Sequence, residues 1–275
     1  MRKIVFSEKE IEDIVFNYLE EQKSLKFIGE KYEVSRDVIK RILIDNNIQL
    51  RRTTNIYKAD YNIFHTIDNP EKAYWVGFIA ADGCVFRREK NGSLLINLNR
   101  KDKRHLEKFR DFMKSNVEIK DYIASDGYCT NSPSEMSKIC FNSIDLVDDL
   151  TAIGVTPKKS LTLKPPKIKE EYYLPYIMGY FDGDGSLYKL NTGEYGINIC
   201  GTSETLSWIC ENLHMECHLR KRFKNKDTNN FYITCGGKQK PYNIIKPMFN
   251  STSTHLDRKY DKFLELEHVV LFGNK

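Results

Sequence analysis

The sequence predicts an α+β fold made of two similar halves and preceded by a small all-α domain. A run of large apolar and aromatic residues ending in Asp-Gly occurs twice, at 73–83 and 174–185. After each copy the expected order of elements is the same: two strands, a helix, two strands and a helix. Before the first copy, the apolar residues follow helical spacing alone. The predicted divisions are a first domain at 1–52, a linker at 53–70, a first repeat at 71–168 and a second repeat at 169–275.

The first domain is predicted to contain three short helices. Residues 7–21 carry apolar side chains at helical spacing and begin with Ser7 and Glu10, a capping-box pattern. Further helices are expected at 24–32 and 35–47, with a tight turn between them. This order is typical of a helix-turn-helix, whose second motif helix enters the major groove of DNA. The alternative is a plain three-helix bundle.

In the helix-turn-helix interpretation, polar residues of the last helix lie near DNA. The two arginines that follow are on an extended arm suited to a minor groove. The predicted DNA-binding residues of this domain are Ser35, Arg36, Lys40, Arg41, Arg51 and Arg52.

The two repeats are predicted element by element from apolar alternation and turn signals. In the first repeat, after the apolar helix, strands are expected at 84–88 and 94–100, a helix at 105–115, strands at 120–126 and 137–143, and a helix at 144–154. In the second repeat the corresponding elements are strands at 186–190 and 195–202, a helix at 204–214, strands at 218–223 and 230–236, and a helix at 241–249.

Small residues lie four positions apart in both apolar helices. Gly77 precedes Ala81, and Gly179 precedes Gly183. This spacing places them on one helix face, where the missing side chains let another backbone approach closely. We therefore expect the two helices to pack on each other.

The aspartates that end these helices, Asp82 and Asp184, are in an unfavourable position without a cation. A carboxylate in the last turn faces the negative end of the helix dipole, at a cost of roughly 0.3–1 kcal/mol. Two such helices side by side also bring like charges together. Mg²⁺ suits this arrangement, since it takes one or two carboxylates and completes its shell with water and phosphate oxygens. A single Asp-Gly often only ends a helix or begins a turn, but its repetition favours metal-dependent phosphodiester hydrolysis.

The two segments resemble the signature motifs of a monomeric LAGLIDADG homing endonuclease, with WVGFIAADG at 75–83 and IMGYFDGDG at 177–185. The similarity extends over about 60–265. It implies two αββαββα halves that form a saddle over double-stranded DNA. The sixth motif position is often acidic in that family, and here it is Ala80 in one copy and Asp182 in the other.

The resemblance also implies the residues of the active site. Asp82 and Asp184 are then the catalytic metal ligands, and Gly83 and Gly185 lie at the metal as well. Two or three Mg²⁺ ions are expected at the repeat interface, with Mn²⁺ as a substitute.

A basic residue near each metal would stabilise charge that develops on the phosphate. By resemblance, these residues are Lys159 and Lys259. A register error of one residue would select Lys158 and Arg258 instead.

Outward-facing residues of the two sheets are candidates for reading DNA, because an antiparallel sheet packed on helices keeps one face free for base edges. In the first half they are Val85, Arg87, Asn97 and Asn99. In the second half they are Tyr188, Asn198, Arg220, Arg222 and Lys224. Arg100 and Thr202, at the ends of corresponding second strands, are expected at DNA and near metal-bound water.

Composition agrees with an intracellular protein. The 43 lysines and arginines exceed the 38 acidic residues by a net charge of +5, and basic runs at 157–169 and 218–226 suit phosphate contacts. Seven cysteines without a C-x-x-C pattern favour a reducing compartment. No signal peptide or apolar run of membrane-spanning length occurs. We expect no membrane contact, and a location in the cytoplasm of a bacterial or phage-infected cell, or in an organelle.

These observations predict a monomeric, divalent-metal-dependent DNA endonuclease that makes a double-strand break in a long asymmetric target. Genes of the family that it resembles usually sit in mobile introns, inteins or free-standing positions. One alternative is a DNA-binding regulator on the same scaffold that no longer cuts. Another is an RNA-splicing maturase.

Overall fold

The structure is a computed structural model that describes residues 6–21, 23–50, 57–125, 133–222 and 228–273. The chain divides into two compact units, Met1–Ile56 and Tyr57–Lys275. Among the described residues, none of the helices has the length and apolar character needed to span a bilayer.

The first unit contains the three predicted helices. They are α1 (Glu8–Leu19), α2 (Leu25–Lys31) and α3 (Arg36–Asp45). The capping box is present, because the Ser7 N–H donates to Glu10 Oε2 at 2.8 Å and the Glu10 N–H donates to Ser7 Oγ at 3.4 Å. The turn between α2 and α3 contains Glu33 with a φ of 54°. The core of this unit consists of Ile14, Tyr18, Ile28, Ile39 and Leu43.

The second unit repeats the order αββαββα, as predicted. The first half contains α4 (Pro70–Asp82), β1 (Gly83–Arg88), β2 (Asn91–Asn99), α5 (Lys103–Phe112), β3 (Lys120–Ala124), β4 (Ser134–Asn142) and α6 (Ile144–Ile153). The second half contains α7 (Tyr173–Asp184), β5 (Gly185–Lys189), β6 (Tyr195–Gly201), α8 (Ser203–Asn212), β7 (Arg220–Lys221), β8 (Phe231–Gly237) and α9 (Gln239–Asn250). Short 3₁₀ helices connect these elements at η1 (Arg100–Asp102), η2 (Lys159–Leu161) and η3 (Glu170–Tyr172).

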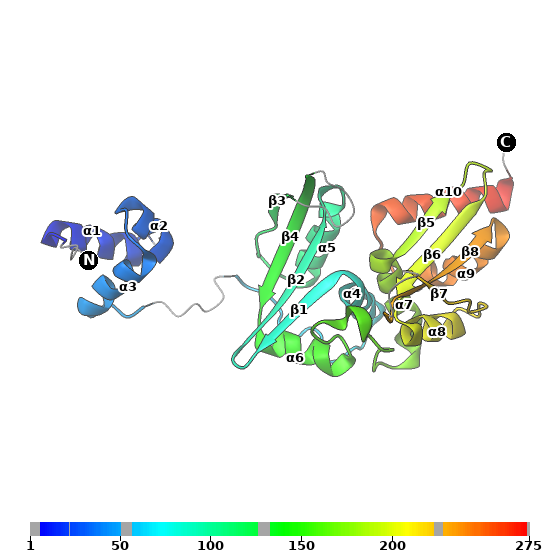
Figure 1. Ribbon diagram of the computed structural model, residues 1–275, viewed down its shortest axis with the longest axis horizontal. Helices are drawn as coiled ribbons and strands as arrows, with labels where there is room; N and C mark the ends of the chain where they lie inside the picture. Colours follow the sequence, from blue (N-terminus) through cyan, green and yellow to red (C-terminus); the bar gives the residue numbers. More distant parts are fainter. Residues whose placement is uncertain (1–5, 22, 51–56, 126–132, 223–227, 274–275) are drawn as a thin grey trace. The chain divides into compact units, whose positions relative to one another are not determined.

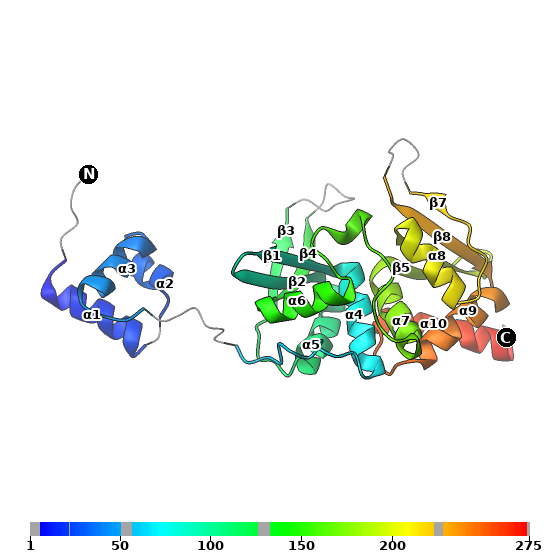
Figure 2. The ribbon, with the colours of Figure 1, turned by 90° about the horizontal axis from the view of Figure 1, so that it is seen from below.

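The two antiparallel sheets have equivalent topology and register. The strand orders are β1-β2-β4-β3 and β5-β6-β8-β7. The motif glycines occupy matching places, with Gly83 opposite Ile96 in one sheet and Gly185 opposite Ile199 in the other. Figure 1 shows α4 and α7 between the two sheets. In Figure 2, α5 and α6 lie on one side of the first sheet, and α8, α9 and α10 on the corresponding side of the second.

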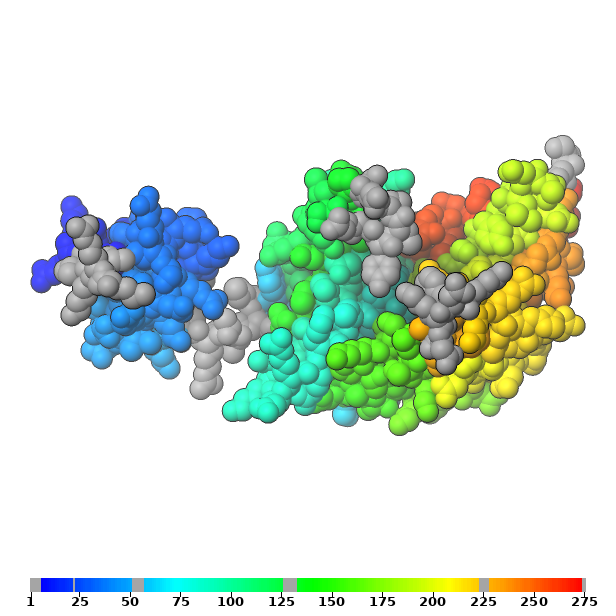
Figure 3. Space-filling model, in the orientation of Figure 1, coloured from blue at the N-terminus to red at the C-terminus, as the bar shows by residue number. Residues whose placement is uncertain are grey.

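A single hydrophobic core runs through both halves of the second unit. α4 and α7 are at its centre, which explains why their sequences are apolar on all sides rather than amphipathic. The ring of Trp75 in α4 packs at a tilt against that of Phe109 in α5, and Tyr176 of α7 meets Trp208 of α8 edge to face. In the space-filling view of Figure 3, the two halves, cyan to green and yellow to red, lie directly against each other.

Two features of this unit differ from the prediction. A further helix, α10 (Asp257–Phe272), follows α9, although we predicted no helix there. Its buried face carries Phe263 and Leu266. These apolar residues are three positions apart, so the sequence did contain a helical signal here. In addition, Ile63 and Phe64, from the segment that we predicted as a linker, are buried in the common core. The part of that segment from Tyr57 onward is therefore built into the second unit.

Candidate active site

The two motif helices touch through their glycines. A Cβ added at Gly77 would lie 1.9 Å from the Tyr176 carbonyl oxygen, and one added at Gly179 would lie 1.9 Å from the Tyr74 carbonyl oxygen. A Cβ at Gly183 would lie 2.3 Å from the Ala81 Cβ. Only glycine allows backbones this close, so the predicted packing of one copy on the other is confirmed.

This contact brings the two aspartates together at the helix ends. Asp82 and Asp184 are the last residues of α4 and α7, and both are partly buried. A Cβ on Gly183 would lie 3.3 Å from the Asp82 carboxyl carbon, so that carboxyl group is directly beside the other helix. Burial and the neighbouring charge of Asp184 raise the pKa of Asp82 to about 6. The two acids therefore repel each other in a poorly solvated place, as we expected from their positions.

Positive charge partly compensates the acids. Burial raises the pKa of Asp184, while the charges of Lys159, Lys259 and Arg222 oppose that rise. Lys259 and Lys159 likewise oppose the rise at Asp82. Of the basic residues that we weighed, Lys159 and Lys259 act on both acids, and the charge of Arg258 also opposes the rise at Asp82. Arg258, one position away, pairs with Asp102 at 3.1 Å.

The lysines hold the C-terminal carbonyls of the motif helices. Lys159 Nζ donates to the carbonyl oxygens of Ala81 at 3.5 Å and Gly83 at 2.5 Å. Lys259 Nζ donates to three carbonyl oxygens, those of Phe181 at 2.5 Å, Asp182 at 2.7 Å and Gly185 at 2.6 Å. The last carbonyls of a helix lack partners within it and favour a cation.

Both ammonium groups are buried among these carbonyls. The exposed fraction is 8% for Lys159 and 2% for Lys259. Burial lowers the pKa of Lys159, and it lowers the pKa of Lys259 to about 8. The carbonyls of Gly83 and Gly185, which we placed at the metal, are occupied by lysines in this arrangement.

The two carboxylates fit a hard divalent cation whose other ligands are water and phosphate oxygens. Among the residues that the structure describes, no group of three or more His, Cys, Asp or Glu side chains is close enough to form a complete metal site. Two carboxylates at the helix ends are what Mg²⁺ requires from a protein when water and phosphate oxygens fill the rest of its shell.

A buried polar network on α7 was missed at the sequence level. Asp182 is 1% exposed, and its Oδ2 accepts hydrogen bonds from the Tyr74 hydroxyl at 2.6 Å and the Leu256 N–H at 2.7 Å. The Tyr74 hydroxyl also lies 3.0 Å from His105 Nε2. The network joins α4, α5, α7 and the start of α10. The sequence does signal that Asp182 is unusual, because it is an acid inside an otherwise apolar helix. Its partners, Tyr74 and Leu256, are too far away in sequence to be identified from it.

Five candidate DNA contacts lie on the open faces of the sheets. Asn97 lies on the outward face of β2, and Asn99 is exposed at the end of that strand. Tyr188 of β5 and Asn198 of β6 have the outward phase of the second sheet. Arg220 of β7, opposite Tyr232, is also exposed on this sheet. Their binding of DNA stays a prediction.

The predicted phase of β1 is wrong. Val85 is 4% exposed, and Arg87 pairs with Asp148 of α6 at 2.7 Å, so both are on the helix-covered face. The outward residues are Cys84, Phe86 and Arg88. Since side chains alternate with a period of two, a shift of one residue exchanges the two faces. Superposing the motif glycines would have placed Phe86 on Tyr188 and avoided the error.

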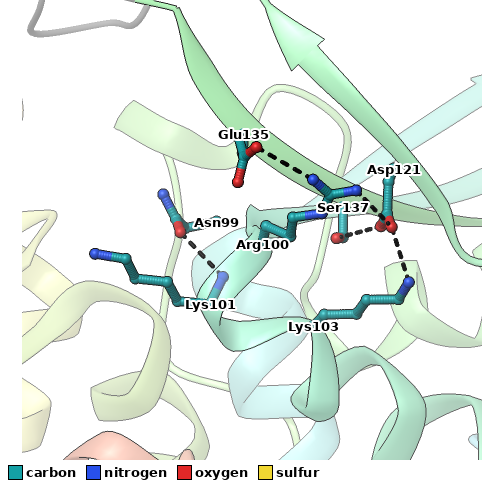
Figure 4. Close-up of polar contacts among 7 residues, drawn as sticks. All are labelled: Asn99, Arg100, Lys101, Lys103, Asp121, Glu135 and Ser137. Carbon is teal, nitrogen blue, oxygen red and sulfur yellow. Dashed lines mark hydrogen bonds and ion pairs between the residues drawn. The ribbon is translucent and has the colours of Figure 1, made fainter.

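Contacts within the protein hold both strand-end candidates, of which Thr202 is buried and Arg100 is exposed. Thr202 is 1% exposed, donates to the Leu163 carbonyl oxygen at 2.6 Å and accepts from the Thr205 N–H at 3.2 Å. It is a buried cap of α8 and not a DNA contact. The Arg100 guanidinium lies between Asp121 and Glu135, 3.2 Å from each, and Figure 4 shows it turned toward these acids.

The remaining candidates are exposed or undescribed. Ser35 is exposed at the start of α3, Arg36, Lys40 and Arg41 are exposed along it, and Arg222 is exposed directly after β7. Their role at DNA stays a prediction. Arg51, Arg52 and Lys224 lie outside the described residues.

Comparisons with known proteins found a matching family model and similar solved structures. The family model of the LAGLIDADG-like domain matches residues 69–132. Similar solved structures include the meganuclease I-SmaMI bound to uncleaveable DNA, with 14% identity, 75% of this chain and 92% of that chain covered, and a TM-score of 0.47. The LAGLIDADG homing endonuclease I-GzeII in complex with its DNA target has 12% identity, 74% and 90% coverage, and a TM-score of 0.47. I-LtrWI bound to target DNA has 13% identity, 77% and 92% coverage, and a TM-score of 0.43. No curated protein matches the sequence.

Proposed function

We propose that this chain, whose residues 69–132 match the family model of the LAGLIDADG-like domain, is a site-specific endonuclease that makes a metal-dependent double-strand break in DNA. The observation that carries the proposal is the pair of carboxylates, Asp82 and Asp184, at the ends of helices that touch through Gly77 and Gly179. Each carboxylate comes from one half of the unit, so each half can serve one strand of a duplex.

Asp82 and Asp184 would hold the divalent ions between the halves. When bound, such an ion polarises the scissile phosphate and lowers the pKa of attacking water. A cation also relieves the repulsion between the carboxylates, so metal binding favours the ionised form of an acid whose pKa is now about 6.

Lys159 and Lys259 have two tasks in this proposal. They hold the ends of α4 and α7 through the carbonyls that they contact, and this fixes the direction of the two aspartates. Their charges also lie beside the acids. At that place they would stabilise the negative charge that develops on the phosphate during cleavage. With a pKa of about 8, Lys259 is mostly protonated at neutral pH.

The target should be long and asymmetric. The open faces of two four-stranded sheets provide an extended surface for base edges. The two halves share a topology but differ in the side chains on those faces, so one chain would read two different half-sites. The ends of the target would then be distinguished without a second copy of the protein.

The test is cleavage of DNA that contains the uninterrupted target. Purified protein is incubated with host genomic DNA and Mg²⁺, and the new DNA ends are mapped by sequencing. We expect discrete double-strand breaks at one or a few sites and none with EDTA. Specific binding without cleavage in Mg²⁺ or Mn²⁺ would contradict a nuclease and would support a DNA-binding regulator.

A further inference from the structure

The two sheets contain structurally equivalent rows of outward-facing residues with opposite chemistry. In each sheet, the first such row lies next to the motif glycine. In the first sheet, Cys84 is opposite Leu95, which is opposite Cys140. In the second sheet, Ser186 is opposite Asn198, which is opposite Thr234. Since Gly83 and Gly185 have matching registers, Leu95 and Asn198 occupy the same position in the two halves.

The two rows are accessible to a ligand. Cys84, Cys140, Ser186 and Thr234 are exposed, and the central residues Leu95 and Asn198 are partly exposed. The inner neighbours in the strands, such as Ile96 and Ile199, are buried under the helices.

The first row presents an apolar side chain between two thiols. Strongly hydrogen-bonding groups are missing from these three side chains, because a thiol is only a weak donor and acceptor. The next outward residue of β1, Phe86, is 50% exposed and enlarges the apolar surface. On DNA, the apolar feature of the major groove is the C5 methyl group of thymine.

The second row presents a carboxamide between two hydroxyl groups. The Asn198 Oδ1 accepts a hydrogen bond from Cys200 Sγ at 3.3 Å, which restrains the direction of the amide. An asparagine amide can bind adenine through both N6 and N7 in the major groove. The next outward residue, Tyr188, lies over Gly196, since a Cβ at that glycine would be 2.6 Å from the tyrosine hydroxyl.

We propose that Leu95 and Asn198 are equivalent specificity-determining residues that read different bases, with Leu95 contacting a thymine methyl in one half-site and Asn198 contacting an adenine in the other. The inference rests on the proposed function, because it assumes that both open faces lie along one duplex. It adds the base chemistry of each half-site and the residue that selects it.

The experiment begins with selection of binding sites by the full-length protein from a randomised duplex DNA library. Calcium replaces magnesium to retain intact duplexes. The selection is repeated with the reciprocal variants Leu95→Asn and Asn198→Leu. Asp145→Asn, at an exposed position on α6, is the matched control.

For Asn198→Leu, we expect loss of adenine preference at one position of one half-site, by about 5- to 150-fold in relative affinity. Leu95→Asn should introduce an adenine preference in the opposite half-site. Asp145→Asn should enrich the wild-type sequence. Reciprocal changes in opposite half-sites would support equivalent positions, and changes in the same half-site would overturn the inference.

Deoxyuridine tests the methyl contact, since it differs from thymidine only by the missing methyl group. At the position affected by Leu95→Asn, this exchange should weaken wild-type binding about fourfold. It should leave binding by Leu95→Asn nearly unchanged. Equal sensitivity of both proteins would overturn the assignment of Leu95. Failure of the wild type to enrich any sequence would contradict the proposed function itself, whereas an enriched site without these preferences would contradict only the present inference.

Discussion

At the scale of single residues, the site is built from charges that are expensive to bury and that compensate one another. Asp82 and Asp184 are beside each other with raised pKa values. Lys159 and Lys259 are buried against helix carbonyls with lowered pKa values. The pKa of each charged group is shifted in the direction that favours its neutral form. This is the usual result when the loss of solvation outweighs the stabilisation by opposite charges. Such clusters are typical of functional sites.

The first prediction concerns Asp184→Asn. The substitution keeps the size of the side chain and removes the charge that we assign to metal binding. We expect target binding in calcium to stay nearly intact and cleavage of both strands in magnesium to be lost. Gel-shift titration and a plasmid cleavage assay measure the two properties. Normal cleavage by the variant would contradict the assignment of this carboxylate as a metal ligand.

The second prediction concerns His105, a buried partner of Tyr74. Burial lowers the pKa of His105 to about 3, below its ordinary value of 6.5. Between these values the unfolded chain binds a proton that the folded chain does not, so this residue's contribution to stability is present above pH 6.5 and is lost as the pH falls toward 3.

We therefore expect His105→Phe to flatten the loss of thermal stability between pH 6.5 and pH 4. The Tyr74 hydroxyl keeps its hydrogen bond to Asp182 in this variant. Melting temperatures of both proteins across this range give the comparison. Parallel pH profiles would show that His105 is not the group that titrates on unfolding.

At the scale of elements, the crossing of α4 and α7 determines where everything else lies. The helices must be apolar on all sides because they are surrounded by both halves, and they must carry glycine where their backbones meet. The sheets follow each helix without a linker, since β1 begins at Gly83 and β5 at Gly185. A change in the crossing would therefore move the acids and the sheets together.

The third prediction tests this crossing with Gly77→Ala. The new Cβ would lie 1.9 Å from the Tyr176 carbonyl oxygen, so the helices must separate. We expect a loss of about 1–3 kcal/mol in the free energy of unfolding. The rate of cleavage should fall by more than any loss of folded protein explains, because the carboxylates move apart. Denaturant titration and cleavage at a temperature where the variant is folded measure both effects.

Gly236→Ala is the matched control for stability. No atom lies within 4 Å of a Cβ at this position. This variant should unfold within about 0.5 kcal/mol of the wild type. Equal stability of Gly77→Ala and Gly236→Ala would show that the close crossing is not required.

At the scale of the whole molecule, two compact units contribute separately to the proposed binding of DNA. Met1–Ile56 has its own small core, and Tyr57–Lys275 contains both sheets and the acids. The boundary is before Lys58, because the Lys58 N–H donates to Asn116 Oδ1 at 2.7 Å and the Asp60 N–H donates to the Met113 carbonyl oxygen at 2.9 Å.

The fourth prediction concerns deletion of residues 1–56. If the exposed basic residues of α3 contact phosphates, their loss should weaken DNA binding and reduce its salt dependence. The remaining unit should stay folded, with its metal-dependent cleavage measurable at low salt. Affinity of the truncated protein is measured over a series of salt concentrations. Unchanged affinity and slope would show that the first unit does not bind the target.

The features of the fold that could be predicted are those that depend on residues close together in the sequence. The helices of the first unit and the αββαββα order follow from apolar period, caps and turns, which act over a few residues. α10 was missed although Phe263 and Leu266 have helical spacing. The outward phase of β1 was missed because a single strand does not specify which face is buried.

The sequence by itself determined the repeat, the glycines that allow close helix packing, and the pairing of Asp82 with Asp184, because these features are written twice with one spacing. Only the tertiary structure decided that Lys159 and Lys259 hold helix carbonyls, that Thr202 is a buried cap, and that Leu95 and Asn198 are equivalent. These facts depend on chain segments that are distant in sequence and meet only after folding. The free energy of such contacts comes from burial and hydrogen bonding between those segments, which local pattern does not encode.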